Sequence, residues 1–246
     1  MHCLPKILAS LRYHIKDTLT FIGFSFIGSL CLLVIITLQL IQQTSLAQFK
    51  INTSNIGTDF RTSAAIEEII QFKQQQIFNS QLILLILIIL FILTLLILNI
   101  YVLQHRKHEI SIFFTANQTD ISITFFVVAQ LVIVIVASFI LSFVCLNFFE
   151  SFFVSELNSF NDNLVLKNSL SANEIQHTVG RLFESDIFAT TANNLLKTDP
   201  STLSDILILS FSKYCKLFLA LFLSSSIFLS ISSFIQIKMF HKRNSR

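Results

Sequence analysis

Four long apolar stretches, separated by polar segments, dominate the pattern of the chain. They cover residues 20–40, 82–104, 121–149 and 217–237. Each has about the 20 apolar residues that a helix needs to cross a bilayer. The second stretch is almost entirely Leu and Ile, as expected for a helix that faces lipid or other helices on all sides. The pattern therefore predicts an all-α membrane protein with four transmembrane helices.

The helical pattern of the second stretch begins well before its membrane segment. Neither Gly nor Pro occurs from Ser63 to Gln104, which predicts one unbroken helix about 60 Å long at 1.5 Å per residue. Because only about 20 residues are needed to span a bilayer, the rest should project outside as a stalk. This stalk belongs to a first external segment, residues 41–81. The earlier part of that segment, from Gln42 to Phe60, is polar and predicted to be irregular.

A second external segment, residues 150–216, is rich in acidic residues. Ser171 and Glu174 have the spacing of a capping box, which predicts a helix that starts there. Asp199 and Pro200 have the residue types of a helix cap and first helical position. The segment is too short for a large core of its own. It is predicted to form a small helical cap that packs on the stalk.

The remaining segments are two basic ends, residues 1–19 and 238–246, and an elbow, residues 105–120. Apolar residues at helical spacing in the first segment favour an amphipathic helix at the membrane surface, and a solvated charged tail is the alternative. The ends and the elbow hold nine Lys/Arg in about 45 residues, and the external segments hold eight in about 105. Basic loops stay in the cytoplasm. We therefore expect a multi-pass protein of the plasma or inner membrane, with both termini and the elbow inside.

The elbow is longer and more amphipathic than a simple turn between two membrane helices, which needs about 2–8 residues. It begins with a basic pair and an acid, continues with an apolar group, and reaches a polar break. This pattern favours a docking element for a cytoplasmic partner. The residues that carry it are Arg106, Lys107, Glu109, Ile110, Ile112, Phe113 and Asn117.

In the order of these residues, the elbow resembles the hallmark segment of FtsX-like/MacB-like ABC transporter permeases. The basic pair, the Glu-Ile pair and the apolar turn stand at matching positions. Asn117 stands where that family usually has Gly, and Asn tolerates the left-handed conformation better than most residues. Asp120 stands where a basic residue is usual, and the small-residue run differs. The resemblance covers the elbow, the topology and the basic lead-in, but neither external segment.

The resemblance implies a permease or mechanotransmission subunit that works with a separate cytoplasmic ABC ATPase. A second permease copy, in a homo- or heterodimer, and membrane lipid would be its other partners. The system would export or extract a lipid, peptide or antibiotic, or control an extracytoplasmic partner. The elbow would be the ATPase-coupling element, with Glu109 its most sensitive charged residue. The alternative is a non-transporting four-helix membrane protein of immunity or sensory type, whose elbow resembles the permeases by chance.

Composition and motifs narrow the functional classes further. The chain is 53% hydrophobic and 13% charged, whereas soluble domains carry about 25% charged residues. A net charge of +3 gives no reason to expect a nucleic-acid partner. The sequence contains no nucleotide-binding loop and no metalloprotease or nucleophile-elbow motif. We therefore expect no enzymatic activity, cofactor or metal site, and ATP hydrolysis by a partner subunit.

Five polar residues within the apolar stretches are candidates for helix packing. Ser25 and Ser29 share a helix face that another helix can approach closely, either within the chain or in a dimer. Ser226 and Ser230 form a second small-residue face. The Gln130 amide is expected to bond across helices, with a substrate contact as the alternative.

Overall fold

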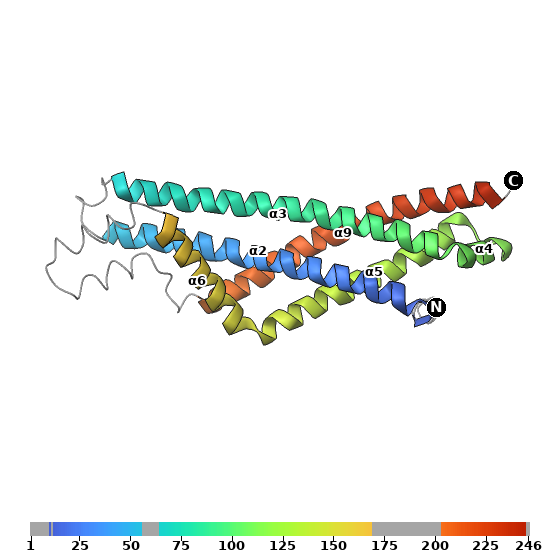
Figure 1. The fold of residues 1–246 in the computed structure, drawn as a ribbon, viewed down its shortest axis with the longest axis horizontal. Coiled ribbons are helices and arrows are strands. Elements are labelled where there is room, and N and C mark those ends of the chain that lie inside the picture. The colour runs from blue at the N-terminus through green and yellow to red at the C-terminus, as the bar shows by residue number, and fades with distance from the viewer. Residues whose placement is uncertain (1–9, 11, 56–63, 169–202, 245–246) are drawn as a thin grey trace. The chain divides into compact units, whose positions relative to one another are not determined.

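The computed structural model describes residues 10, 12–55, 64–168 and 203–244, and their regular structure is entirely helical (Figure 1). Four helices are long and apolar enough to cross a membrane, which confirms the predicted all-helical, multi-pass class. The described helices are α2 (Ile15–Asn55), α3 (Ala64–His105), α4 (Lys107–Thr115), α5 (Asp120–Phe148), α6 (Glu150–Asn168) and α9 (Leu203–Asn244).

Helix α3 runs without a break through 42 residues, from Ala64 to His105. This agrees with the continuous helix predicted from the absence of Gly and Pro, whose interior positions would cost about 1 and 3 kcal/mol relative to Ala. The continuity of the helix is confirmed, and its projection from the membrane as a stalk stays a prediction.

Helix α2 differs from the sequence prediction. The sequence predicts an irregular stretch after Gln42, yet the helix continues to Asn55. The reason is a buried stripe at four-residue spacing, which is one face of a helix. Because two members of this stripe are polar, the stretch has little apolar signal. The buried residues of the stripe are Ile41, Ser45, Phe49 and Thr53.

The chain divides into two compact units. The first comprises Met1–Leu32, Ile86–Asn147 and Cys215–Arg246. Its core contains an aromatic row that connects three helices. Phe91 of α3 lies edge-on to Phe139 of α5, with ring centroids 6.1 Å apart, and Phe139 packs on Phe218 of α9 at 4.1 Å. The row fixes the contacts among α3, α5 and α9 in this unit.

The second unit comprises Leu33–Leu85 and Phe148–Tyr214, and it buries several polar side chains. The Lys73 ammonium donates to the Ser45 hydroxyl and lies 5.6 Å from the centroid of the Phe49 ring. Ser80 donates to the Gln42 side-chain oxygen at 2.6 Å. These contacts join α2 and α3 with hydrogen bonds as well as apolar packing, which satisfies polar groups that would otherwise be buried alone.

The predicted cap lies mostly outside the described residues. This applies to the helix start at Ser171 and Glu174 and to the start at Asp199 and Pro200. Within the described part of that segment, α6 is helical from Glu150 to Asn168.

Candidate functional site around α4

The predicted elbow contains a short helix, α4, of nine residues. Ile110 anchors it, with 2% of its surface exposed. At its end, the Asn117 N–H donates to the Phe114 carbonyl at 3.0 Å, and the Gln118 N–H donates to the Phe113 carbonyl at 3.2 Å. Asn117 has φ 58° and is the one non-glycine residue with positive φ in the described parts of the chain. It ends the helix in the left-handed conformation, as the sequence predicts.

Helix α5 begins directly after this turn. The Thr119 hydroxyl accepts the Ser122 N–H at 3.4 Å, as a capping residue does for the third residue of a helix. Asp120 lies in the first turn, where a negative charge interacts favourably with the helix dipole. A left-handed residue and a cap therefore separate α4 from α5 within a few residues, which gives the elbow a defined shape.

Arg106 is buried at the junction of α3 and α4, with 5% of its surface exposed. Its guanidinium donates to the side-chain oxygen of Gln130, which comes from α5 and is 1% exposed. Burial lowers the pKa of Arg106 from its usual value, while the carboxylates of Glu109 and Asp17 act in the opposite direction. An arginine stays protonated in such surroundings. Arg106 and Gln130 therefore tie the start of α4 to α5, which is the cross-helix role predicted for Gln130.

Glu109 connects α4 to the amino-terminal segment. Its carboxylate accepts a hydrogen bond from the Ser10 hydroxyl at 3.2 Å and lies 2.9 Å from the His14 ring nitrogen Nε2. The Glu109 side chain is 28% exposed. Because its two oxygens have these partners within the chain, Glu109 contributes to the internal attachment of α4.

The last turns of α9 also contact the elbow. The His241 ring nitrogen Nδ1 lies 2.9 Å from an Asp120 carboxylate oxygen, and its ring centroid lies 4.8 Å from that of Phe114. The Lys107 ammonium lies 5.6 Å from the centroid of the Phe240 ring, within cation–π range. Figure 1 shows α4 beside the last turns of α9 in this unit.

The outer face of α4 remains exposed. Ile112 is 53% exposed, and residues 115–119 form a continuous exposed run. The structure therefore separates the predicted ATPase-coupling residues into two groups. Those at the surface are Lys107, Ile112 and Asn117, and those buried or half-buried against the chain are Arg106, Glu109, Ile110 and Phe113.

Ser25 and Ser29 are both fully buried. The hydroxyls of Ser29 and Ser142 share a hydrogen bond, and Ser142 also donates to the Phe26 carbonyl at 3.3 Å. Of the two possibilities left open by the sequence, Ser29 packs against α5 within the chain, and Ser25 is buried without a hydrogen-bond partner among the described residues.

The other small-residue pair lies away from the most buried face of α9. Ser226 and Ser230 are half-buried, and the Ser230 hydroxyl donates to its own helix at the Ser226 carbonyl. The cross-helix contact of α9 comes from Ser233, which is fully buried and shares hydrogen bonds with Asn99 of α3 at 3.2 and 3.3 Å. The polar contact lies one turn beyond the predicted pair.

Sequence reasoning missed several residues of these networks. The partners His14 and His241 lie 95 and 121 residues from their carboxylates, and no local pattern indicates such pairs. Lys73 did leave a signal, because it continues the buried stripe of Ile66 and Ile69 along α3. A lysine on an otherwise apolar stripe indicates a buried charge with a partner.

The residues around α4 attach this helix to other elements of the chain and leave its outer face available for contact. Within the described parts of the chain, no group of three His, Cys, Asp or Glu side chains is placed to hold a metal ion. Comparisons of the chain with protein-family models, with curated proteins and with solved structures found no match.

Proposed function

We propose that this chain is the permease or mechanotransmission subunit of an ABC system, and that a separate cytoplasmic ATPase docks on α4. Two copies of the chain, or one copy with a related permease, form the membrane part. The system exports or extracts a lipid, peptide or antibiotic, or it controls an extracytoplasmic partner. In this arrangement the end of the bundle that carries α4 faces the cytoplasm.

The observation that carries this proposal is the simultaneous attachment of α4 to several elements while its outer face stays exposed. Glu109 contacts the segment that leads into α2, Phe113 packs on Phe126 of α5 at 5.6 Å, and Lys107 contacts Phe240 of α9. Packed interiors transmit displacement because they have few voids into which side chains can move. A partner that moves α4 therefore moves the ends of these helices with it.

The continuous helix α3 could transmit a movement of α4 away from the docking site. It ends at His105, directly before α4, and continues for 42 residues without a glycine or proline. Kinks in helices usually occur at such residues. A tilt of α4 is therefore expected to move α3 as a rod, which suits a subunit that performs mechanical work for an external ATPase.

The first test is a pull-down in mild detergent that measures a P-loop ATPase per unit of membrane-inserted protein. Ile112→Asp places a charge on the exposed face and should reduce ATPase retention at least thirtyfold, since a central apolar anchor contributes about 2 kcal/mol or more. Glu109→Gln is the matched control, because it alters the internal contact with His14. It should lower stability and leave retention per folded molecule close to wild type.

This expectation differs from the one based on the sequence alone, in which Glu109 is the most sensitive position. Retention of wild-type ATPase levels by Ile112→Asp would show that α4 is not the docking element. If the wild-type chain retains no P-loop ATPase in any mild detergent, the permease proposal fails, and a non-transporting four-helix protein takes its place. A Gln118→Cys variant tests the orientation, because a membrane-impermeant reagent should label it only after the cells are opened.

A further inference from the structure

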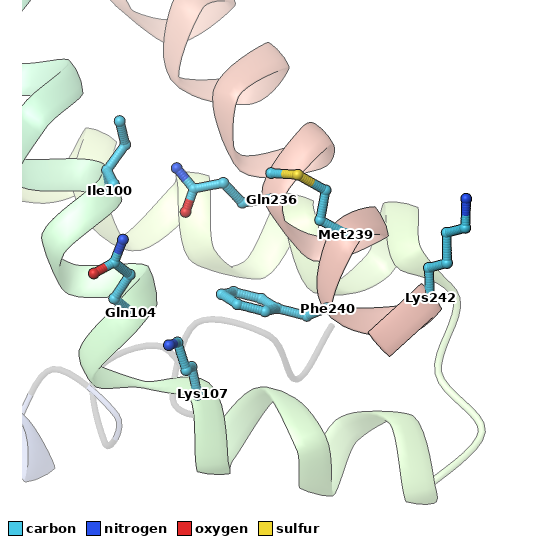
Figure 2. Close-up of a pocket in the computed structure, with 7 residues that line it drawn as sticks. All are labelled: Ile100, Gln104, Lys107, Gln236, Met239, Phe240 and Lys242. Carbon is cyan, nitrogen blue, oxygen red and sulfur yellow. The ribbon is translucent and has the colours of Figure 1, made fainter. Parts of the chain in front are cut away.

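A cleft of about 700 Å³ lies between the last turns of α3 and α9, beside the first residue of α4. It combines two amides, two lysines and three apolar side chains. Its lining residues are Ile100, Gln104, Lys107, Gln236, Met239, Phe240 and Lys242. Figure 2 shows Gln104 and Gln236 extending into the space between the two helices, with the Phe240 ring and Lys107 beside them. The mixture of cationic, amide and apolar groups in one cleft indicates an amphipathic ligand with a negative charge.

The polar groups of the cleft are suited to an anionic headgroup. Lys107 supplies a positive charge beside the Phe240 ring (Figure 2). Lys242 also lines the cleft, and in Figure 2 its ammonium points away from the two amides. The Gln236 side-chain oxygen is buried and has no hydrogen-bond partner among the described residues. Buried polar atoms in proteins are normally satisfied. The Gln236 amide can turn either its oxygen or its nitrogen toward a ligand. Its oxygen would accept from a ligand hydroxyl, and its nitrogen would donate to a phosphate oxygen.

The apolar part of the cleft favours a lipid over a free anion. Ile100 and Met239 line the cleft, and 39% and 57% of their surfaces stay exposed. The cleft also lies where the apolar segments of α3 and α9 end, at His105 and Lys242. Basic pockets between membrane helices at this level are typical sites for anionic lipid headgroups. A free phosphate would leave the apolar lining exposed to water.

We propose that this cleft binds one anionic phospholipid, with its phosphate beside Lys107 and Gln104 and its acyl chains along Ile100 and Met239. The lipid would join α3 to α9 at the same end of the unit as α4. This role goes beyond ATPase docking and does not depend on it, because it requires only that this end lies at a membrane surface.

The test uses the purified chain in detergent and native mass spectrometry, without any ATPase. Phosphatidylglycerol and phosphatidylcholine with the same acyl chains are the two probes. The wild type should retain one phosphatidylglycerol molecule and exchange phosphatidylcholine freely. Each lysine near an anionic headgroup contributes about fivefold in affinity. The double variant Lys107→Gln/Lys242→Gln should therefore lose about twenty-five-fold in occupancy.

Lys238→Gln is the matched control, because it removes one positive charge from exposed α9 surface outside the cleft. It should change phosphatidylglycerol occupancy less than twofold. Millimolar inorganic phosphate should not displace the lipid, and displacement would show a site for free phosphate instead. A photoreactive phosphatidylglycerol should crosslink to peptides from 100–107 and 236–242, which tests the wild-type chain even if the double variant misfolds. Equal retention of both lipids, or crosslinks confined to other segments, would overturn the proposal.

Discussion

The close approach of α2 and α3 at Gly28 makes a strong prediction about stability. A Cβ atom added at Gly28 would lie 2.5 Å from Cδ2 and 2.7 Å from Cε2 of the Phe91 ring. Real atoms do not approach so closely, so the ring would have to move. Phe91 is only 7% exposed and lies perpendicular to Phe139, which leaves the ring little space. Gly28→Ala should therefore force a local repacking.

The size of the effect follows from two opposing contributions. Replacing Gly by Ala within a helix contributes about 0.5–1 kcal/mol of stability, whereas overpacking of a filled core costs about 1–3 kcal/mol. We expect a net loss of up to about 2.5 kcal/mol, with a middle value of about 1 kcal/mol, for Gly28→Ala. Gly23→Ala is the matched control on the same helix, because nothing lies within 4 Å of its added Cβ. The Gly23→Ala variant should be more stable than the wild type by about 0.5–1 kcal/mol.

The chain contains no tryptophan, so the assay is the fraction that stays monodisperse by size-exclusion chromatography after heating in detergent. The melting temperature should fall for Gly28→Ala and rise slightly for Gly23→Ala. The double variant Gly28→Ala/Phe91→Leu should recover part of the loss, with a coupling energy of about 1 kcal/mol between the two sites. Equal melting temperatures for the two single glycine variants would refute the close contact between Gly28 and Phe91.

Two other predictions use the same assay. Asn117→Gly should keep or slightly raise the melting temperature, whereas Asn117→Val should cost about 1–2 kcal/mol, because φ is 58° at this position; an unchanged valine variant would contradict the left-handed assignment. Ser80→Ala should cost about 1–3 kcal/mol, because it leaves the buried Gln42 oxygen without the donor that lies at 2.6 Å. Adding Gln42→Leu to that variant should restore stability, and additive losses would count against the hydrogen bond.

Much of the fold could be predicted from local patterns. The apolar stretches predicted the all-helical membrane class, and the long run without Gly or Pro predicted the continuity of α3. The left-handed turn at Asn117 could also be predicted, because Asn is one of the few residues that tolerate positive φ. These features depend on residues that are close in sequence, so a single sequence contains their signal.

The internal contacts of α4 could not be predicted in the same way. Glu109 could equally contact a partner protein or its own chain, and the choice depends on where His14 is placed by the fold. The helical end of α2 was missed because Ser45 and Thr53 are polar, although both are buried. The partner of Glu109 and the burial of Ser45 and Thr53 both depend on which segment the fold places beside them, and not on the residue itself.

The contact between Arg106 and Gln130 has a consequence for the order in which the protein assembles. The two residues are only 24 positions apart, so the hairpin of α3, α4 and α5 can give the buried Arg106 guanidinium a hydrogen-bond acceptor as soon as α5 is synthesised. The contact of Asn99 with Ser233 spans 134 positions and has to wait for α9. Short-range contacts form early and long-range contacts form late. The hairpin can therefore form its Arg106–Gln130 contact before α9 is present, whereas the contacts of Lys107 with Phe240 and of Asp120 with His241 are completed only when α9 is added.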